Sequence, residues 1–121
     1  MRANELMIGD WVKSRGKIEQ VTSVYDGYIC TDSFEDSHDY YFDPIPLTPE
    51  ILEKNGFEKK TFYGIYDDYF DLDIREYSDG LYIVTYHSCE FNIPDQTIHL
   101  SWVHELQNFM RHCGIDKEIV L

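Results

Sequence analysis

The sequence predicts a single α+β domain that spans residues 1–121. We expect residues 1–46 to form an SH3-like small β-barrel, residues 47–57 a short capped helix, and residues 58–121 an antiparallel sheet covered by a C-terminal helix. Three observations lead to this prediction. Two Asp-Gly pairs stand between runs of strand-forming residues and mark hairpins. A helix with signals at both ends lies between them, and an amphipathic stretch closes the chain.

Length and composition set the class of the protein. The chain of 121 residues is long enough to bury roughly two-thirds of its unfolded surface. Its 43% hydrophobic and 16% aromatic content excludes a disordered chain, although the formal net charge is -13. Three cysteines lie far apart and form no CxxC pair, so we expect neither a disulfide framework nor a zinc knuckle. Without an apolar run of signal-peptide or membrane-span length, a soluble cytoplasmic protein is expected.

The N-terminal half contains several short strands joined by tight turns. Asp26-Gly27 is its strongest turn signal. A two-residue loop at this position pairs Tyr25 with Tyr28 and Val24 with Ile29, which puts the aromatic and aliphatic pairs on opposite faces. Short strands with such turns are typical of a strongly bent barrel of SH3-like size.

The connecting helix has a start signal and a stop signal. Thr48 can cap its first free N–H groups, and Pro49 suits the first helical position, where a backbone donor would have no partner. Gly56 supplies the left-handed residue after the helix, and Phe57 follows where it can pack back on Leu52. About two helical turns are too short to be stable alone, so tertiary packing must hold this helix.

Four strands are predicted in the C-terminal half, at residues 62–66, 69–77, 81–86 and 90–93. The second strand alternates, with Leu72 and Ile74 on its inner face and Asp71 and Asp73 on its outer face. The third strand is apolar on both faces. We therefore expect it to be central in the sheet.

A second hairpin turns at Asp79-Gly80. With a two-residue loop, Tyr77 pairs with Tyr82 and Asp73 pairs with Tyr86. This register depends on a regular strand throughout, because one extra residue would move every pair.

The last predicted helix runs from about Trp102 to His112, with Ser101 as its cap and Gly114 after its end. Its apolar stripe contains Trp102, Leu106, Phe109, Met110 and Cys113, and its polar side contains Glu105, Gln107, Asn108 and Arg111. No other stretch is long and amphipathic. We therefore expect this helix to cover the C-terminal sheet.

Three motifs resemble those of a known family. They are Arg2-Ala3-Asn4-Glu5-Leu6 with Ile8-Gly9-Asp10-Trp11-Val12, then Pro44-Ile45-Pro46-Leu47-Thr48-Pro49-Glu50-Ile51-Leu52-Glu53-Lys54-Asn55-Gly56-Phe57, then Val103-His104-Glu105-Leu106-Gln107-Asn108. In this order they resemble a family of small uncharacterised proteins encoded by gut Bacteroidales and by their phages and mobile elements. Asp10 stands where that family more often has asparagine, and the end of the last helix departs from the family pattern. The resemblance implies a source, but no activity, ligand or catalytic residue.

Candidate metal and catalytic patterns are incomplete. His104-Glu105 begins a His-Glu-x-x-His zinc motif, but Asn108 stands at the second histidine, and we interpret His104 as a half-exposed residue near the helix start. Cys89 follows His87 closely, yet no oxyanion site or activating base accompanies it. We predict no catalytic residue, metal or cofactor. A small enzyme with an unrecognised His, Cys or carboxylate site is the alternative, which a cleft holding His87, Cys89 or His104 beside desolvated carboxylates would favour.

Acidic residues gather in two stretches, residues 26–43 and 67–79, with six acids each. Such charge disfavours direct binding of nucleic acid, because the phosphates would be repelled. The simplest interpretation is a solvated surface on an acidic protein. A calcium site is a further option, although the second stretch lacks the EF-hand glycine and closing glutamate.

A more specific hypothesis is that the second acidic stretch forms a docking face for a basic host or phage protein. Alternation in the strand places acidic and aromatic side chains together on its outer side, and the candidate partner surface comprises Asp67, Asp68, Tyr69, Asp71 and Asp73. The leading hypothesis is therefore a non-enzymatic accessory protein of a phage or mobile element that acts through protein contacts.

Overall fold

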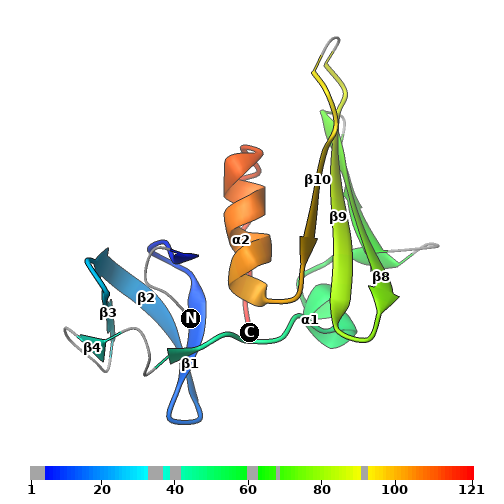
Figure 1. The fold of residues 1–121 in the computed structure, drawn as a ribbon. Helices are drawn as coiled ribbons and strands as arrows, with labels where there is room; N and C mark the ends of the chain where they lie inside the picture. Colours follow the sequence, from blue (N-terminus) through cyan, green and yellow to red (C-terminus); the bar gives the residue numbers. More distant parts are fainter. Residues whose placement is uncertain (1–4, 33–36, 39–41, 60–62, 68, 91–92) are drawn as a thin grey trace. The chain divides into compact units, whose positions relative to one another are not determined.

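The computed structural model describes residues 5–32, 37–38, 42–59, 63–67, 69–90 and 93–121 (Figure 1). The chain has a mixed α+β structure, with two antiparallel sheets and two helices in these residues. It divides into two compact units, one of Met1–Pro46 with Trp102–His112 and one of Leu47–Ser101 with Cys113–Leu121. The expectation of a single domain stays a prediction.

The first unit contains a five-stranded sheet in the order β4-β3-β2-β1-β5, which curls into a half-barrel (Figure 1). Its strands are β1 (Trp11–Ser14), β2 (Lys17–Tyr25), β3 (Tyr28–Thr31), β4 (Ser37–His38) and β5 (Phe42–Asp43). The turn between β2 and β3 pairs Tyr25 with Tyr28 and Val24 with Ile29, as predicted. Likeness to an SH3 barrel in particular stays a prediction. The buried core of the sheet comprises Leu6, Val12, Val21, Ile29 and Phe42.

The helix α2 (Val103–His112) belongs to the first unit. It buries the apolar residues Val103, Leu106, Phe109 and Met110. The helix contacts β1 and bonds to the segment before β1. The expectation that it covers the C-terminal sheet stays a prediction. An amphipathic pattern identifies the buried face of a helix, but not the sheet on which that face packs.

Polar side chains fix the position of α2 in this unit. Gln107, predicted to face water, is only 5% exposed. Its Oε1 accepts the Trp11 N–H at 2.9 Å, and its Nε2 donates to the Gly9 carbonyl at 3.1 Å. Arg111, also predicted to face water, is half-buried and donates to the fully buried carboxylate of Asp10. The helix therefore has a polar contact with the start of β1 as well as an apolar one.

The second unit contains the sheet β10-β9-β8-β7-β6, in which successive strands are neighbours. Its strands are β6 (Glu58–Lys59), β7 (Tyr63–Tyr66), β8 (Phe70–Ser78), β9 (Leu81–Ser88) and β10 (Gln96–Leu100). The central place predicted for the third strand is confirmed, since β9 pairs with both β8 and β10. The strand expected at residues 90–93 is not found at Glu90 or Ile93, and residues 91–92 lie outside the described part of the chain. The sequence did not indicate β10.

The second hairpin has the predicted turn but a different register. Ser78 pairs with Leu81 across Asp79-Gly80, which confirms the two-residue loop. The register then shifts between Glu76 and Ser78, so that Glu76, and not Tyr77, faces Tyr82. The predicted pairs Tyr77–Tyr82 and Asp73–Tyr86 are therefore wrong, and Asp73 faces Thr85. A bulge adds one residue to one strand only, and nothing in the local sequence marked it.

The ends of α1 (Pro49–Lys54) are as predicted. Thr48 Oγ1 accepts the Ile51 N–H at 3.3 Å. Gly56 has a positive φ of 80°, and the Phe57 N–H donates to the Leu52 carbonyl at 3.1 Å, which closes the helix in a Schellman arrangement. Leu52 and Phe57 are both buried.

The C-terminal segment packs in the second unit. Asn55, which follows α1, donates from Nδ2 to the Val120 carbonyl at 2.8 Å and accepts the Val120 N–H at 2.7 Å. Ile115 and Ile119 are buried in this segment. The second unit thus buries apolar side chains from α1 and from the end of the chain. Neither helix in the described residues is long and apolar enough to cross a membrane.

Candidate binding site on the second sheet

The predicted surface residues lie in and just before β8. Asp71 and Asp73 alternate with the buried Leu72, as predicted, and both are half-buried. Tyr69 precedes the strand and is 76% exposed. Asp67 is also exposed, and its carboxylate accepts the Tyr69 N–H at 3.0 Å. Asp68 lies outside the described residues.

Strand pairing extends this polar row across the sheet. Asp71 faces His87 on β9, and Asp73 faces Thr85. Thr85 in turn faces Thr97 on β10, with the two hydroxyl oxygens 3.3 Å apart. We call the side of the second sheet that carries Asp71, Asp73, Thr85, His87 and Thr97 the outer face. The acidic residues of the sequence thus stand beside hydroxyl and imidazole groups.

His87 lies between two carboxylates. Its Nε2 is 3.3 Å from Asp73 Oδ2, and its Nδ1 is 2.8 Å from Asp95 Oδ2. Both contacts join a ring nitrogen to a carboxylate oxygen, so the imidazole of His87 lies within ion-pair distance of two acids.

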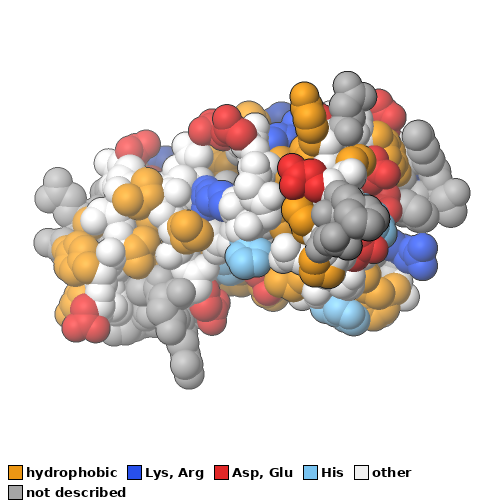
Figure 2. All heavy atoms as spheres, turned by 90° about the horizontal axis from the view of Figure 1, so that it is seen from above, with side chains coloured by type: hydrophobic (Ala, Val, Ile, Leu, Met, Phe, Trp, Pro, Cys, Tyr) orange, Lys and Arg blue, Asp and Glu red, His pale blue; other side chains and the backbone are white. Residues whose placement is uncertain are grey.

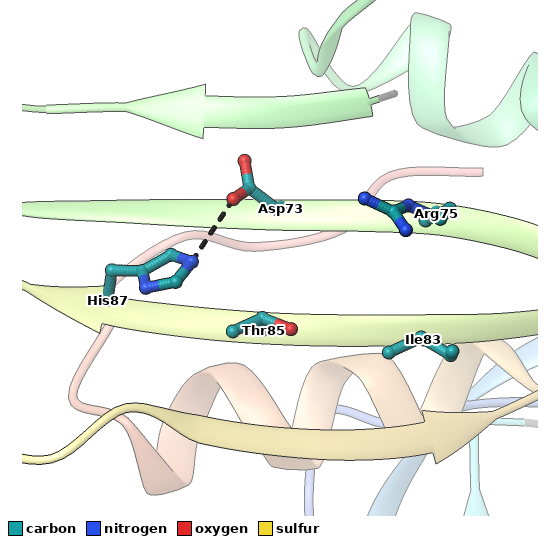
Figure 3. A pocket seen from close by; sticks show the side chains of 5 residues that line it. All are labelled: Asp73, Arg75, Ile83, Thr85 and His87. Carbon is teal, nitrogen blue, oxygen red and sulfur yellow. Dashed lines mark ion pairs between the residues drawn. The ribbon is translucent and has the colours of Figure 1, made fainter. Parts of the chain in front are cut away.

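A shallow pocket opens beside this histidine, with a volume of about 200 Å³. Figure 3 shows its lining, in which Asp73 lies next to His87 and the other side chains continue along the two strands: Asp73, Arg75, Ile83, Thr85 and His87. Asp73 Oδ1 is buried and makes no hydrogen bond of standard geometry among the described residues. The Tyr66 hydroxyl is nevertheless close enough to Asp73 for a hydrogen bond between them to raise the pKa of the tyrosine. The carboxylate of Asp73 thus lies between Tyr66, His87 and the pocket.

The β7 side of the outer face is closed by Tyr66. Gly64 faces Asp73, and a side chain at Gly64 would come within 2.5 Å of the Tyr66 hydroxyl oxygen. The Tyr66 ring thus occupies the space that glycine leaves open. Burial raises the pKa of Tyr66, and the neighbouring negative charge of Asp73 raises it further. The hydroxyl therefore stays protonated at neutral pH.

The other candidate residues do not join this site. His104 is only 2% exposed, which corrects the interpretation as a half-exposed residue, and its Nδ1 has no hydrogen-bond partner among the described residues. Burial lowers its pKa. Cys89 is exposed after the end of β9. Among the described residues, no group of three or more His, Cys, Asp or Glu side chains is placed to hold a metal ion.

The acidic surface is mixed in character. In the space-filling view, red carboxylates are interspersed with hydrophobic, histidine and basic side chains (Figure 2). At the pocket itself, Arg75 and His87 stand beside Asp73. The site is therefore a set of defined polar positions and not a uniform acidic field.

Sequence reasoning found part of this site. Alternation along the strand identified Asp71 and Asp73. It did not connect His87 or Asp95 with them, because the bulge changes the register of β8 and β9 and because β10 was not predicted. The approach of Asp95 to His87 depends on both features.

A comparison with protein-family models, with curated proteins and with solved structures finds no match to this chain. Its function is therefore inferred from the residues of the site.

Proposed function

We propose that this protein is a non-enzymatic binding protein that docks a basic partner on the outer face of its second sheet. The observation that carries the proposal is the carboxylate of Asp73, which lines an accessible pocket and has a second carboxylate, that of Asp71, on the same side of its strand. An ionised carboxylate oxygen accepts hydrogen bonds and attracts positive charge. A lysine or arginine side chain supplies both a donor and a positive charge.

The surroundings of Asp73 also favour a cationic ligand. Asp71 and Asp95 contribute two more carboxylates near the pocket, against one permanent cation, Arg75. Exposed aromatic area lies at the start of β8, where Tyr69 is 76% exposed. Tyrosine is enriched at protein interfaces, because its ring gives contact area with little loss of conformational entropy.

The alternative of a small enzyme gains some support, because the pocket holds His87 beside the partly buried carboxylate of Asp73. The contacts of His87 count against this alternative. His87 is the histidine in the pocket, and both of its ring nitrogens face carboxylate oxygens. A general base needs a nitrogen that can reach the proton of a substrate. Neither nitrogen is available while the two carboxylate contacts are made.

The proposal keeps the expected biological setting. An acidic surface disfavours direct contact with nucleic acid, so the partner is a protein with a basic surface. The resemblance to proteins of Bacteroidales phages and mobile elements directs the search to a host or phage protein in the cytoplasm. This origin stays a prediction.

A binding series with a defined basic probe tests the proposal. The probe is tetralysine, with tetraglutamate as its anionic counterpart, and binding is followed by NMR shifts of the backbone amides. We expect tetralysine to shift amides of β8 and β9, and the double change Asp71→Asn with Asp73→Asn to weaken binding at least tenfold, since two acceptors are removed.

The matched control removes two charges elsewhere in the same unit. Asp116 and Glu118 are exposed in the C-terminal segment, so Asp116→Asn with Glu118→Gln removes the same number of negative charges from the protein. This control should bind tetralysine within about twofold of the unaltered protein, as expected for distant charges screened by salt. Equal losses in both double variants would mean that tetralysine senses only the overall charge, and the proposal would fail.

A further inference from the structure

The edge strands of the two sheets differ in length. In the described part of the chain, β4, β5 and β6 are edge strands of two residues each. β10 ends the second sheet at its other edge and has five residues, Gln96–Leu100. An edge strand presents unpaired backbone N–H and C=O groups, and proteins commonly limit this exposure by keeping such strands short. β10 is therefore the edge along which a further strand can pair over the greatest length.

β10 also lacks the features that usually prevent pairing at an edge. Lysine, proline and β-bulges serve this purpose in natural sheets. β10 contains neither lysine nor proline, and it pairs with β9 without a register shift. β6, by contrast, consists of Glu58 and Lys59, which are both charged and exposed. Among the described residues, the side of β10 away from β9 pairs with no strand. We call this side the β10 edge.

We infer that a basic partner binds to the β10 edge as an additional antiparallel strand, with alternate basic side chains on the outer face. This inference rests on the proposed function, and it adds the conformation of the partner segment and the strand with which it pairs. In this mode of recognition, backbone hydrogen bonds give the affinity and alternate side chains give the selectivity.

The register of the sheet sets which side chains of an added strand reach the outer face. On β10, Thr97 faces Thr85 and His99 faces Ile83, so Thr97 and His99 project on the side of the pocket lining. Both are exposed. A residue of an added strand that pairs with Thr97 projects on the same side, because directly opposed residues share a face. Every second residue of the partner segment therefore projects on the outer face.

Negative charge lies beside these positions. Asp95 directly precedes β10, and its side chain is 57% exposed. Its Oδ2 lies 2.8 Å from Nδ1 of His87, which lines the pocket, so the carboxylate is on the outer side. A partner side chain beside Asp95 starts one strand spacing away, about 4.8 Å. Asp71 and Asp73 continue the negative charge across the sheet on β8. Outward basic side chains complement this row.

The charge of the chain also decides between a second copy and a different protein as the added strand. Pairing of β10 with β10 of a second copy would bring together two chains that each have a formal net charge of -13. Repulsion between them opposes this association, whereas a basic segment is attracted. The occupant is therefore an extended basic segment of another protein.

Hydrogen exchange of the β10 amides tests the inference, because it reports backbone pairing directly. The probe is the acetylated and amidated peptide Lys-Thr-Lys-Thr-Lys-Thr-Lys, in which basic residues alternate with a strand-forming residue. We expect the β10 amides that point away from β9 to exchange fast in the free protein. Saturating peptide should slow their exchange at least about tenfold, since they become hydrogen-bonded.

Two N-methylated forms of the peptide are the matched controls. One has N-methyl groups on its lysines and the other on its threonines. Each keeps the side chains and the charge but loses the N–H donors along one edge of the peptide, because successive N–H groups of a strand point to opposite edges. We expect one of the two forms to bind at least about tenfold more weakly than the unmodified peptide, since pairing with β10 uses the donors of one edge.

The outcomes separate this inference from the function on which it rests. If neither tetralysine nor the peptide shifts amides of β8 and β9, the binding function and the added strand are both wrong. If tetralysine binds there while the peptide leaves exchange of the β10 amides unchanged, the added strand alone is wrong. Equal affinities of all three peptides would also contradict it, because charge alone would then explain binding.

The free protein provides a further check. If all β10 amides exchange slowly without peptide, the β10 edge is already covered by the chain itself. If they become slow only at high protein concentration, a second copy pairs there. Either result overturns the inference.

Discussion

At the scale of single residues, the polar residues near the two ends of the chain have a structural role in the first unit. Gly9, Asp10 and Trp11 bond to Gln107 and Arg111, although about one hundred positions separate them in the sequence. Gly9 leaves room for Arg111, since a side chain there would come within 3.1 Å of the Arg111 Nη2. These residues hold α2 on the first sheet.

The buried pair of Asp10 and Arg111 gives the first prediction. Burial raises the pKa of Asp10, although the Met7 N–H and Arg111 oppose the shift. We expect Arg111→Met to lower the free energy of unfolding by about 3–5 kcal/mol at neutral pH, because an ionised carboxylate is left buried without its cation. Denaturant midpoints measure this loss. Arg15→Met, which changes an exposed arginine of the same unit, should have an effect within about 0.5 kcal/mol.

The pH dependence of the Arg111→Met loss follows from the direction of the Asp10 shift. A carboxyl group with a raised pKa in the folded state contributes most to stability below its unfolded pKa, and this contribution is lost as the pH rises through the folded value. Without Arg111 the Asp10 pKa should rise further. The loss in the variant should therefore shrink as the pH falls toward about 4. A loss that is constant with pH would mean that Arg111 acts through packing alone.

His104 provides a second prediction at this scale. Burial lowers its pKa, so the unfolded chain binds a proton more readily than the folded one. The contribution of His104 to stability is therefore fully present above the unfolded pKa of about 6.5 and is lost as the pH falls below it. We expect the unfolding free energy of His104→Gln to fall less steeply between about pH 7 and pH 5 than that of the unaltered protein.

At the scale of elements, several local signals predicted the structure correctly, because a few neighbouring residues decide it. The cap at Thr48, the left-handed Gly56 and the Asp26-Gly27 turn depend on a few adjacent positions, and all three were predicted. The bulge after Glu76 and the partner of α2 depend on residues far apart in the chain. This difference explains why the turns of the second sheet were found while the pairing of Asp73 was not.

The same reason limited the prediction of the site. Alternation in β8 is a local property, and it correctly put Asp71 and Asp73 on one side of the strand. The position of His87 between Asp73 and Asp95 requires the register of three strands. The pattern of one sequence does not determine such a register when one of the strands contains a bulge.

The connecting helix gives the third prediction. Thr48→Ala should lower the unfolding free energy by about 1 kcal/mol through the lost cap, and Leu52→Ala by about 2–5 kcal/mol, because Leu52 is fully buried. Denaturant midpoints again measure both effects. Leu81→Ala serves as a control, since Leu81 is 40% exposed and should lose clearly less. A Leu52→Ala protein as stable as the unaltered one would show that α1 is peripheral to the second unit.

At the scale of the whole molecule, the formal net charge of -13 acts on any encounter with a basic partner. Long-range attraction raises the association rate and is weakened by salt, whereas short-range contacts set the dissociation rate. The outer face carries charged groups, which act over long range, and aromatic area, which acts in direct contact. The carboxylate of Asp73 lines the pocket, Asp71 lies on the same side of β8, and Tyr69 is exposed just before the strand.

The different roles of charge in association and of contact area in dissociation give the last prediction. It applies to a partner protein once one has been captured. Asp71→Lys with Asp73→Lys reverses two charges on the outer face and should slow association strongly at low salt, because the local attraction becomes repulsion. Tyr69→Ala removes contact area without changing charge and should mainly speed dissociation. One series of binding kinetics across ionic strength measures both rates. Association of the unaltered protein that does not depend on salt would mean that the carboxylates of the outer face only solvate the surface, and docking would then have to rest on Tyr69 and its apolar neighbours.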